Sequence, residues 1–227
     1  MKQFKIRASA CGQIMTNDRS GKNMGKTVQT YCETWLKEQL YNRRKEFSNK
    51  YTQKGLIVED NSLDFVADQL KLGMLIKNEQ FFENDFMTGT PDAILKDLII
   101  DVKNSWSWDT FPLFESEIPN KDYYYQAQCY MELTGKKRFK LIYVLSDTPD
   151  NLIVQAVRSY VYQNGLDEID VDLYDLFVAK MTYSDVPDTL KIKVYEIEYD
   201  ELIIEAIRKR VEDCRLYISE LLIKIGA

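Results

Sequence analysis

Hydrophobic and polar residues alternate along this chain of 227 residues in patterns that predict both helices and strands. Apolar side chains at helical spacing predict helices over about 28–48, 55–70, 122–133, 150–163, 167–181 and 200–224. Strand patterns, separated by an irregular aromatic segment at 105–119, are found at about 74–77, 80–87, 91–95, 98–103, 139–145 and 190–199. Interleaved helices and strands of this kind predict an α/β fold with a mixed central β-sheet flanked by helices.

One hairpin of the predicted sheet carries charged residues in an informative arrangement. Pro91-Asp92 precedes the mostly apolar segment 93–100, and Asp101-Val102-Lys103 follows it. Strand residues two apart point to the same face, so Asp101 and Lys103 share a face while Val102 points to the other. A tight turn within the segment would bring Asp92 back beside them. The chain holds no other acid-x-Lys triplet, and the alternative is a surface hairpin with ordinary charged ends.

The carboxylates of this hairpin are suited to a divalent metal ion. Mg²⁺ and Mn²⁺ prefer oxygen ligands, which Asp92, Asp101 and the Val102 carbonyl supply. We expect Glu59 as a further ligand, from a helix that begins after Gly55; the alternative for Glu59 is a solvated helix acid. We predict two such ions and hydrolysis of a phosphodiester, because these ions polarise phosphoryl oxygens and activate water.

Lys103 and a later helix complete the predicted catalytic group. Lys103 either helps to orient and deprotonate the attacking water or stabilises charge on the phosphate. Gln126 and Tyr130 lie four residues apart on one helix face, where Gln126 can hydrogen-bond a phosphate oxygen or Lys103, and Tyr130 can use its hydroxyl in the same way. The alternative for this helix is an aromatic-rich core element, which we prefer for Tyr123 and Tyr125.

Composition narrows the chemistry further. The chain has no histidine, which excludes Ser-His-Asp hydrolases, histidine-dependent nucleases and His-ligated metal sites. Its four cysteines form no C-x-x-C pair, so we expect reduced, mostly buried thiols instead of a zinc ribbon. No apolar run is long enough for a transmembrane helix and the N-terminus lacks an apolar signal-peptide core, so we expect a cytoplasmic protein of a bacterium or phage-infected cell.

Charge is unevenly distributed along the chain. The net charge is −6, but residues 1–54 carry twelve Lys and Arg against four acids. A basic N-terminal quarter on an acidic body would hold a polyanion on one face and repel it elsewhere. For Arg43-Arg44-Lys45, the alternative is a helix with solvated charges.

Five short motifs over about residues 4–145 resemble, in the same order, those of the phage lambda exonuclease and viral alkaline exonuclease family of PD-(D/E)XK nucleases. They are Arg7-Ala8-Ser9 with Arg19-Ser20-Gly21-Lys22, Gly55-x-x-x-Glu59, Thr90-Pro91-Asp92, Asp101-x-Lys103, and a helix with Tyr124, Gln126, Gln128, Met131 and Thr134. Thr90 and Asp101 stand where the family has Ser and Glu, and both keep the chemistry.

The resemblance implies a restriction-endonuclease-like core and a 5′→3′ exonuclease that degrades linear double-stranded DNA with free ends. The 3′ single strands that remain would serve phage-type homologous recombination with a single-strand annealing recombinase as partner. It also implies a homo-oligomer in the form of a trimeric ring. By the same resemblance, the Ser9 and Thr90 hydroxyls contact the 5′ phosphate region, and Arg7, Lys22 and Tyr124 belong with Tyr130 to the DNA-binding residues.

We interpret the chain as a single nuclease domain in three parts. These are a basic helical part over 1–54, a catalytic core over about 55–147, and a helix-strand-helix extension over about 148–227. Two other functions stay open: a PD-(D/E)XK endonuclease or junction resolvase, and a DNA-binding protein with a vestigial nuclease site. The presence together of Glu59, Asp92, Asp101, Lys103 and Gln126 counts against a vestigial site.

Overall fold

A mixed sheet organises the protein. The computed structural model describes residues 2–21, 23–45, 49–166, 168 and 170–226. The larger sheet has the strand order β4 (Ala93–Ile94), β5 (Ile99–Asn104), β6 (Arg138–Val144), β7 (Ile192–Glu198). Strands β5 and β6 are parallel, whereas β4 and β7 are antiparallel to their neighbours. A smaller sheet has the order β1 (Ile6–Arg7), β3 (Met87–Gly89), β2 (Phe82–Glu83). The predicted α/β class with a mixed sheet is confirmed.

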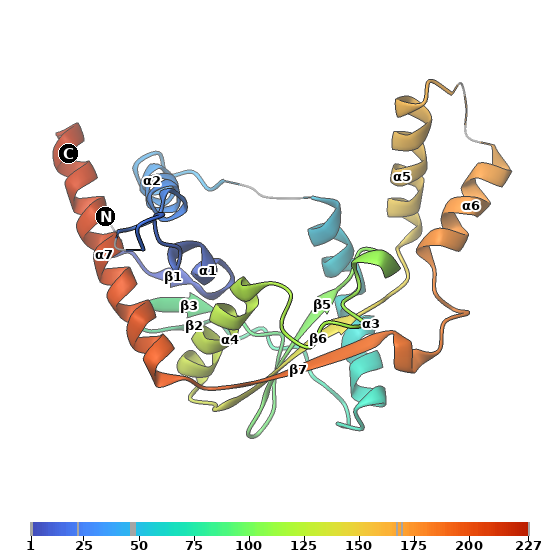
Figure 1. Cartoon of the computed structure of the whole chain (residues 1–227), viewed down its shortest axis with the longest axis horizontal. Coiled ribbons are helices and arrows are strands. Elements are labelled where there is room, and N and C mark those ends of the chain that lie inside the picture. Colours follow the sequence, from blue (N-terminus) through green and yellow to red (C-terminus); the bar gives the residue numbers. More distant parts are fainter. Residues whose placement is uncertain (1, 22, 46–48, 167, 169, 227) are drawn as a thin grey trace.

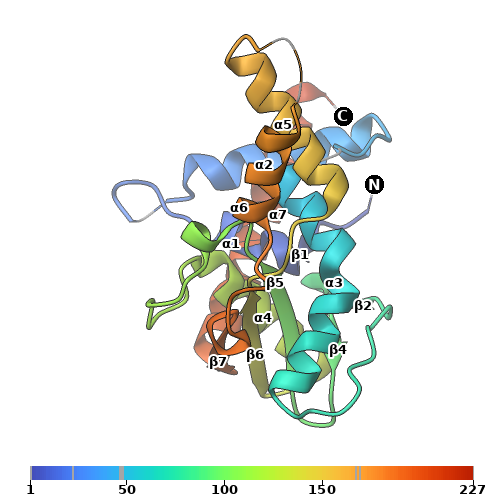
Figure 2. The same cartoon turned by 90° about the vertical axis from the view of Figure 1, so that its right-hand side faces the viewer.

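Helices α3 (Lys50–Gln69) and α4 (Lys121–Thr134) cover opposite faces of the larger sheet (Figure 2). Alternation along β5 explains the arrangement, since Ile100 and Val102 pack with the apolar residues of α3 and Ile99 packs with those of α4. Asp101 and Lys103 have the same parity as Ile99 and therefore point to the α4 face. The predicted shared face of these two residues is borne out.

The remaining helices lie at two ends of the molecule (Figure 1). At one end, α1 (Cys11–Ile14), α2 (Lys26–Leu40) and the long α7 (Glu201–Ile225) pack together. At the other end, α5 (Asp150–Gln163) and α6 (Val171–Met181) rise side by side beyond the sheet as an arm. All four cysteines are buried and free, as expected. None of the described helices is both long and apolar enough to cross a membrane.

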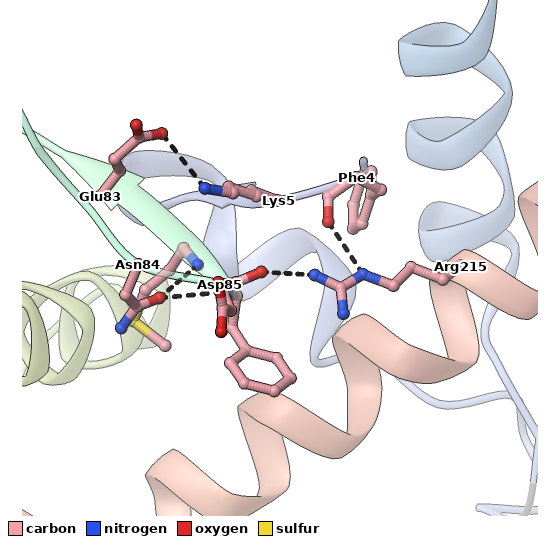
Figure 3. A network of polar contacts seen from close by, with 8 residues as sticks. Phe4, Lys5, Glu83, Asn84, Asp85 and Arg215 are labelled. Carbon is pink, nitrogen blue, oxygen red and sulfur yellow. Dashed lines mark hydrogen bonds and ion pairs between the residues drawn. The ribbon is translucent and has the colours of Figure 1, made fainter. Parts of the chain in front are cut away.

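The C-terminal helix is fastened to the N-terminal strand through Arg215 (Figure 3). Its Nε donates a 3.1 Å hydrogen bond to the Phe4 carbonyl, and its Nη2 donates to the Asp85 carbonyl in the turn between β2 and β3. Lys5 and Glu83 form an ion pair of 3.3 Å across the same sheet. These contacts place β1, and with it the start of the chain, beside β3 and the segment that leads to Asp92.

Three helix boundaries differ clearly from the sequence predictions. One is the start of α6, which lies at Val171 after the Asp170 N-cap instead of at about residue 167. Helix α2 ends at Leu40 because the chain turns at Asn42, whose φ is +47°, so Arg43 and Arg44 are not helical. Residues 46–48, the end of the predicted helix, lie outside the described residues. Helix α3 begins at Lys50 under a capping box formed by Asn49 and Thr52, which puts Gly55 inside the helix instead of before it.

Predicted strands between the helices are shorter than expected. Of the segments 74–77 and 80–87, only β2, the first residue of β3 and an isolated bridge at Lys77 are paired. Asn84 explains the break, because its side chain accepts hydrogen bonds of 2.9 Å from the N–H groups of Phe86 and Met87 and so makes a turn.

Candidate active site

Asp92 folds back onto the strand that follows it. The turn of the hairpin closes with a 2.8 Å hydrogen bond from the Leu95 N–H to the Leu98 carbonyl. At the open end, Asp92 Oδ2 accepts a 2.9 Å hydrogen bond from the Val102 N–H. The predicted return of Asp92 to the side of Asp101 and Lys103 is therefore present, and a main-chain hydrogen bond fixes it.

Asp101 and Lys103 are in direct contact on the α4 face of β5. Lys103 Nζ lies 2.5 Å from Asp101 Oδ2, and only 1% of the Asp101 side chain is exposed. Lys103 Nζ also lies 5.0 Å from the ring centroid of Tyr123 on α4. The ammonium group is thus held between a carboxylate and an aromatic ring, which attracts cations through its face.

Helix α4 supplies the amide and the phenol that the sequence predicted. Gln126 Nε2 lies 3.4 Å from Asp101 Oδ1 and 3.0 Å from the Tyr130 hydroxyl. All three side chains are buried. Gly89 makes this approach possible, because a Cβ there would lie 2.6 Å from Tyr130 Cε1.

The charges of the site influence each other strongly. Burial and the Asp101 charge raise the pKa of Asp92 to about 7, against the opposing effect of Lys103 and the Val102 N–H. Burial alone would lower the pKa of Lys103, but the Asp101 and Asp92 carboxylates hold it above its ordinary value. Two carboxylates this close at a buried position favour an additional cation between them.

Glu59 is placed differently from the other predicted ligands. It lies on α3, which covers the face opposite to Asp101, and its Oε2 forms a 2.9 Å ion pair with Lys77 Nζ. Glu59 is close enough for its charge to raise the pKa of Asp92. Yet no cluster of three or more His, Cys, Asp or Glu positioned to hold a metal exists within the described residues. The expected ligand set is therefore not assembled, since Lys77 engages Glu59.

Asp92 and Asp101 themselves fit a divalent cation. Asp101 Oδ2 is buried and has no hydrogen-bond donor among the described residues apart from the Lys103 ammonium that pairs with it. With both carboxylates ionised, Asp92 and Asp101 carry one negative charge more than the Lys103 ammonium balances, which is a costly arrangement at this site unless another cation is present. These two carboxylates would hold the ion, and water would complete a shell of the kind that Mg²⁺ keeps.

The residues predicted to bind DNA are distributed around this group. Ser9 and Thr90 are exposed; Ser9 lies in the 3-10 turn Ala8–Ala10 that follows β1, and Thr90 directly follows the neighbouring strand β3. Arg7, on β1, is also exposed. Tyr124 points away from Asp101, and its hydroxyl lies 3.4 Å from Asp200 at the start of α7. Lys22 lies outside the described residues.

Two residues near the site were not selected from the sequence. The sequence favours a core position for Tyr123, yet its ring faces Lys103. Its position three residues before Gln126, on one helix face, is the signal that indicates this. Lys54 is one of the twelve basic residues of segment 1–54, yet only 1% of it is exposed. Its Nζ donates to the carbonyls of Ser105, Trp106 and Ser146 at 2.7–3.0 Å. No local signal could have revealed these three distant partners.

The solved structures that this chain resembles include exonucleases. A phage-related exonuclease from Haemophilus somnus 129PT is 26% identical, with a TM-score of 0.81 over 99% of this chain and 97% of that one. An alkaline exonuclease from Laribacter hongkongensis is 15% identical, with a TM-score of 0.66 over 98% of this chain and 91% of that one. The Laribacter enzyme in complex with dAMP is 17% identical, with a TM-score of 0.65. No protein family description and no curated protein sequence matches the chain.

Proposed function

We propose that this chain, which belongs to the phage lambda exonuclease-like and viral alkaline exonuclease family of PD-(D/E)XK nucleases, degrades linear duplex DNA from its 5′ ends. That the protein is a nuclease enzyme follows from the family. The polarity, the dependence on Mg²⁺ or Mn²⁺, and the role in phage-type recombination beside a single-strand annealing recombinase are the parts we propose.

The observation that carries the proposal is the grouping of Asp92, Asp101 and Lys103 beneath Gln126. The four polar side chains come from a β-hairpin and a helix. Asp101 contacts Lys103 at 2.5 Å and Gln126 at 3.4 Å, and the Val102 N–H fixes Asp92 beside them through a 2.9 Å hydrogen bond. A divalent ion bound by the two carboxylates would stabilise charge on the phosphate and activate water. The buried, hydrogen-bonded setting fixes these groups before substrate arrives, which makes electrostatic stabilisation effective.

The chain's own residues have distinct tasks in this reaction. Asp92 and Asp101 would hold the ion, and Glu59 would join them if its ion pair with Lys77 opened. Lys103 would orient the attacking water or stabilise the charged phosphate oxygens. Gln126 holds Asp101 in place and, together with Tyr130, could donate to a phosphate oxygen.

An exonuclease must recognise the end of a strand, and the residues around Ser9 are suited to that task. Ser9 and Thr90 present hydroxyl groups just beyond the paired strands β1 and β3, and Arg7, the last residue of β1, adds a positive charge two residues before Ser9. A terminal 5′ phosphate offers additional charge-assisted hydrogen bonds that an internal phosphodiester lacks. We propose that these three residues bind it, and that subunits close into a trimeric ring around the duplex.

The test uses linear duplex DNA with different labels at its 5′ and 3′ ends, incubated with Mg²⁺. We expect early release of the 5′ label as mononucleotide, persistence of the 3′ label, and slower digestion when the 5′ end carries a hydroxyl. Early loss of the 3′ label would refute the polarity. Cutting of covalently closed circular duplex at a comparable rate would instead support the endonuclease alternative.

A further inference from the structure

A pocket of about 670 Å³ lies outside the catalytic group, between the α5–α6 arm and the segment that follows β5. Its volume lies in the range of about 300–1,000 Å³ typical of small-molecule sites. Trp106, which lines it, follows Lys103 by three residues, so about 10 Å of extended chain at most separates them. The pocket therefore lies close to the end of β5, the strand that carries Asp101 and Lys103. Figure 1 shows the α5–α6 arm rising beyond the end of that strand.

Aromatic rings form the walls of the pocket. Trp106, Trp108, Tyr160 and Phe177 all line it. Trp108 is 66% exposed and Tyr160 is 42% exposed, which are large values for such side chains. Tyr160 packs edge-on against Phe177 with their ring centroids 5.5 Å apart. Open aromatic faces of this kind are where a planar ligand stacks.

The polar lining favours a nucleotide over an apolar ligand. Gln155, Ser159 and Gln163 repeat every four residues along α5 and face the pocket with amide and hydroxyl groups. Lys50 and Lys180 add two ammonium groups, and neither forms an ion pair with an acid in the part of the chain that the structure describes. Asp109 is the acid among the lining residues.

The segment that carries the tryptophans is held in place before any ligand binds. Lys54 Nζ donates to the carbonyls of Ser105 and Trp106, and a capping box between Ser107 and Thr110 fixes the turn with Trp108. The Trp106 ring packs edge-on against Tyr51, and Lys50 Nζ lies 4.8 Å from its centroid. A rigid platform loses little entropy on binding.

We infer that this pocket binds single-stranded DNA, with bases stacked on Trp108 and Tyr160 and phosphates near Lys50 and Lys180. The inference rests on the proposed function, in which digestion of one strand leaves the other single. The pocket would hold that strand beside the site where its complement is removed. Amide and hydroxyl groups on α5 would contact base edges, while the stacking itself tolerates any sequence.

Binding of a fluorescein-labelled oligothymidylate to the full chain, measured by anisotropy in EDTA, tests the inference without cleavage. Trp108→Ala should weaken binding about 5- to 100-fold, since base stacking on an aromatic residue contributes on that order. Phe114→Ala is the matched control, because Phe114 is 91% exposed in the same segment and does not line the pocket. Its affinity should stay within about twofold of wild type.

Charge is tested in the same way. Lys180→Gln should reduce the slope of log K against log salt for oligothymidylate binding by about 0.7, the value for one phosphate contact on a single strand, whereas Lys209→Gln, on α7 at the other end of the molecule, should not. Unchanged oligothymidylate affinity in Trp108→Ala overturns the inference and leaves the pocket to another class of ligand. The experiments distinguish the failure of this inference from the failure of the proposed nuclease function. If the wild-type protein digests duplex DNA normally but Trp108→Ala binds oligothymidylate with unchanged affinity, only the inference about the pocket fails. A chain that fails to digest duplex DNA yet depends on Trp108 for single-strand binding keeps the pocket.

Discussion

Lys103 Nζ lies 2.5 Å from Asp101 Oδ2 on one face of β5, and the side chain of Asp101 is almost completely buried. The pair is held from the other side by α4, through Gln126 on Asp101 and the Tyr123 ring on Lys103. A phosphate oxygen or a cation that enters the site therefore meets charges that are already positioned.

Replacement of Lys103 by alanine should reduce DNA cleavage by about three orders of magnitude, because charge stabilisation or water orientation is lost. Binding of duplex DNA in Ca²⁺, which shows that the variant is folded, should persist. Lys140→Ala is the matched control, since Lys140 Nζ forms a 2.9 Å ion pair with Glu196 on the neighbouring strands. Turnover close to wild type in Lys103→Ala would remove the catalytic assignment.

Metal binding should depend on the two carboxylates of the hairpin. Mg²⁺ or Mn²⁺ should raise the melting temperature of the wild-type protein, by an amount equivalent to about 2.7 kcal/mol at a hundredfold excess over Kd. Asp101→Asn should lose this shift together with activity, whereas Asp97→Asn, in the exposed turn of the same hairpin, should keep both. EDTA should abolish cleavage. A full metal-induced shift in Asp101→Asn would show that the ion binds elsewhere.

The hairpin could be predicted from the sequence because its determinants are local. Alternation fixed the faces of Asp101 and Lys103, and the turn brought Asp92 within hydrogen-bonding distance of Val102. Helical spacing likewise placed Gln126 and Tyr130 together on the face that meets the sheet. Each of these relationships spans ten residues or fewer along the chain, so a single hairpin or helix determines it.

Relationships between distant segments could not be predicted in the same way. The buried Lys54 ammonium donates to carbonyls at the ends of two strands, which follow it in the sequence by 51 or more residues. The sequence predicts Glu59 as a further metal ligand, but it states neither which face of the sheet α3 covers nor that Lys77 engages the Glu59 carboxylate. Helix α2 ends earlier than predicted because the backbone at Asn42 is left-handed, and a single asparagine in the sequence does not predict that conformation.

Two glycine substitutions should have opposite effects on stability. In Gly89→Ala the new Cβ would lie 2.6 Å from Tyr130 and 3.1 Å from Ala8, so the free energy of unfolding should fall by about 1–3 kcal/mol. Activity should fall too, because Tyr130 contacts Gln126. In Gly55→Ala the Cβ enters open space within α3, and stability should rise by about 0.5–1 kcal/mol. Urea denaturation measures both, and a stable, fully active Gly89→Ala would show that Tyr130 is free to move.

Lys54→Met should destabilise the fold by about 3 kcal/mol or more at neutral pH, because three carbonyls lose a charged donor.

Burial lowers the pKa of Lys54 to about 8, against the opposing charge of Asp147. Above that pH the unfolded chain binds the additional proton, so this residue should make the wild-type protein more stable as pH rises from 8 toward about 10.4. The carbonyls favour the ammonium form, which limits the rise to about 3 kcal/mol at most. Lys54→Met should lack it, as urea denaturation across this range would show; equal slopes in the two proteins would contradict the assignment.

The basic N-terminal quarter should supply phosphate contacts through a groove of about 460 Å³, lined by Lys2, Lys5, Arg7, Arg43 and Arg44. Arg43 and Arg44 are exposed and lie beyond the end of α2, where the chain can follow a DNA backbone. Each phosphate contact contributes about 0.9 to the slope of log K against log salt, so replacing both arginines by alanine should reduce the slope by about 2. Replacing Lys96 and Arg138, two exposed basic residues at the closed end of the catalytic hairpin, should leave the slope unchanged.

The measurement is duplex binding in Ca²⁺ over a series of salt concentrations. Because phosphate contacts carry no sequence information, the loss should be the same for duplexes of different sequence. Equal slopes for the arginine variant and wild type would mean that these two charges face solvent and that the strand passes elsewhere.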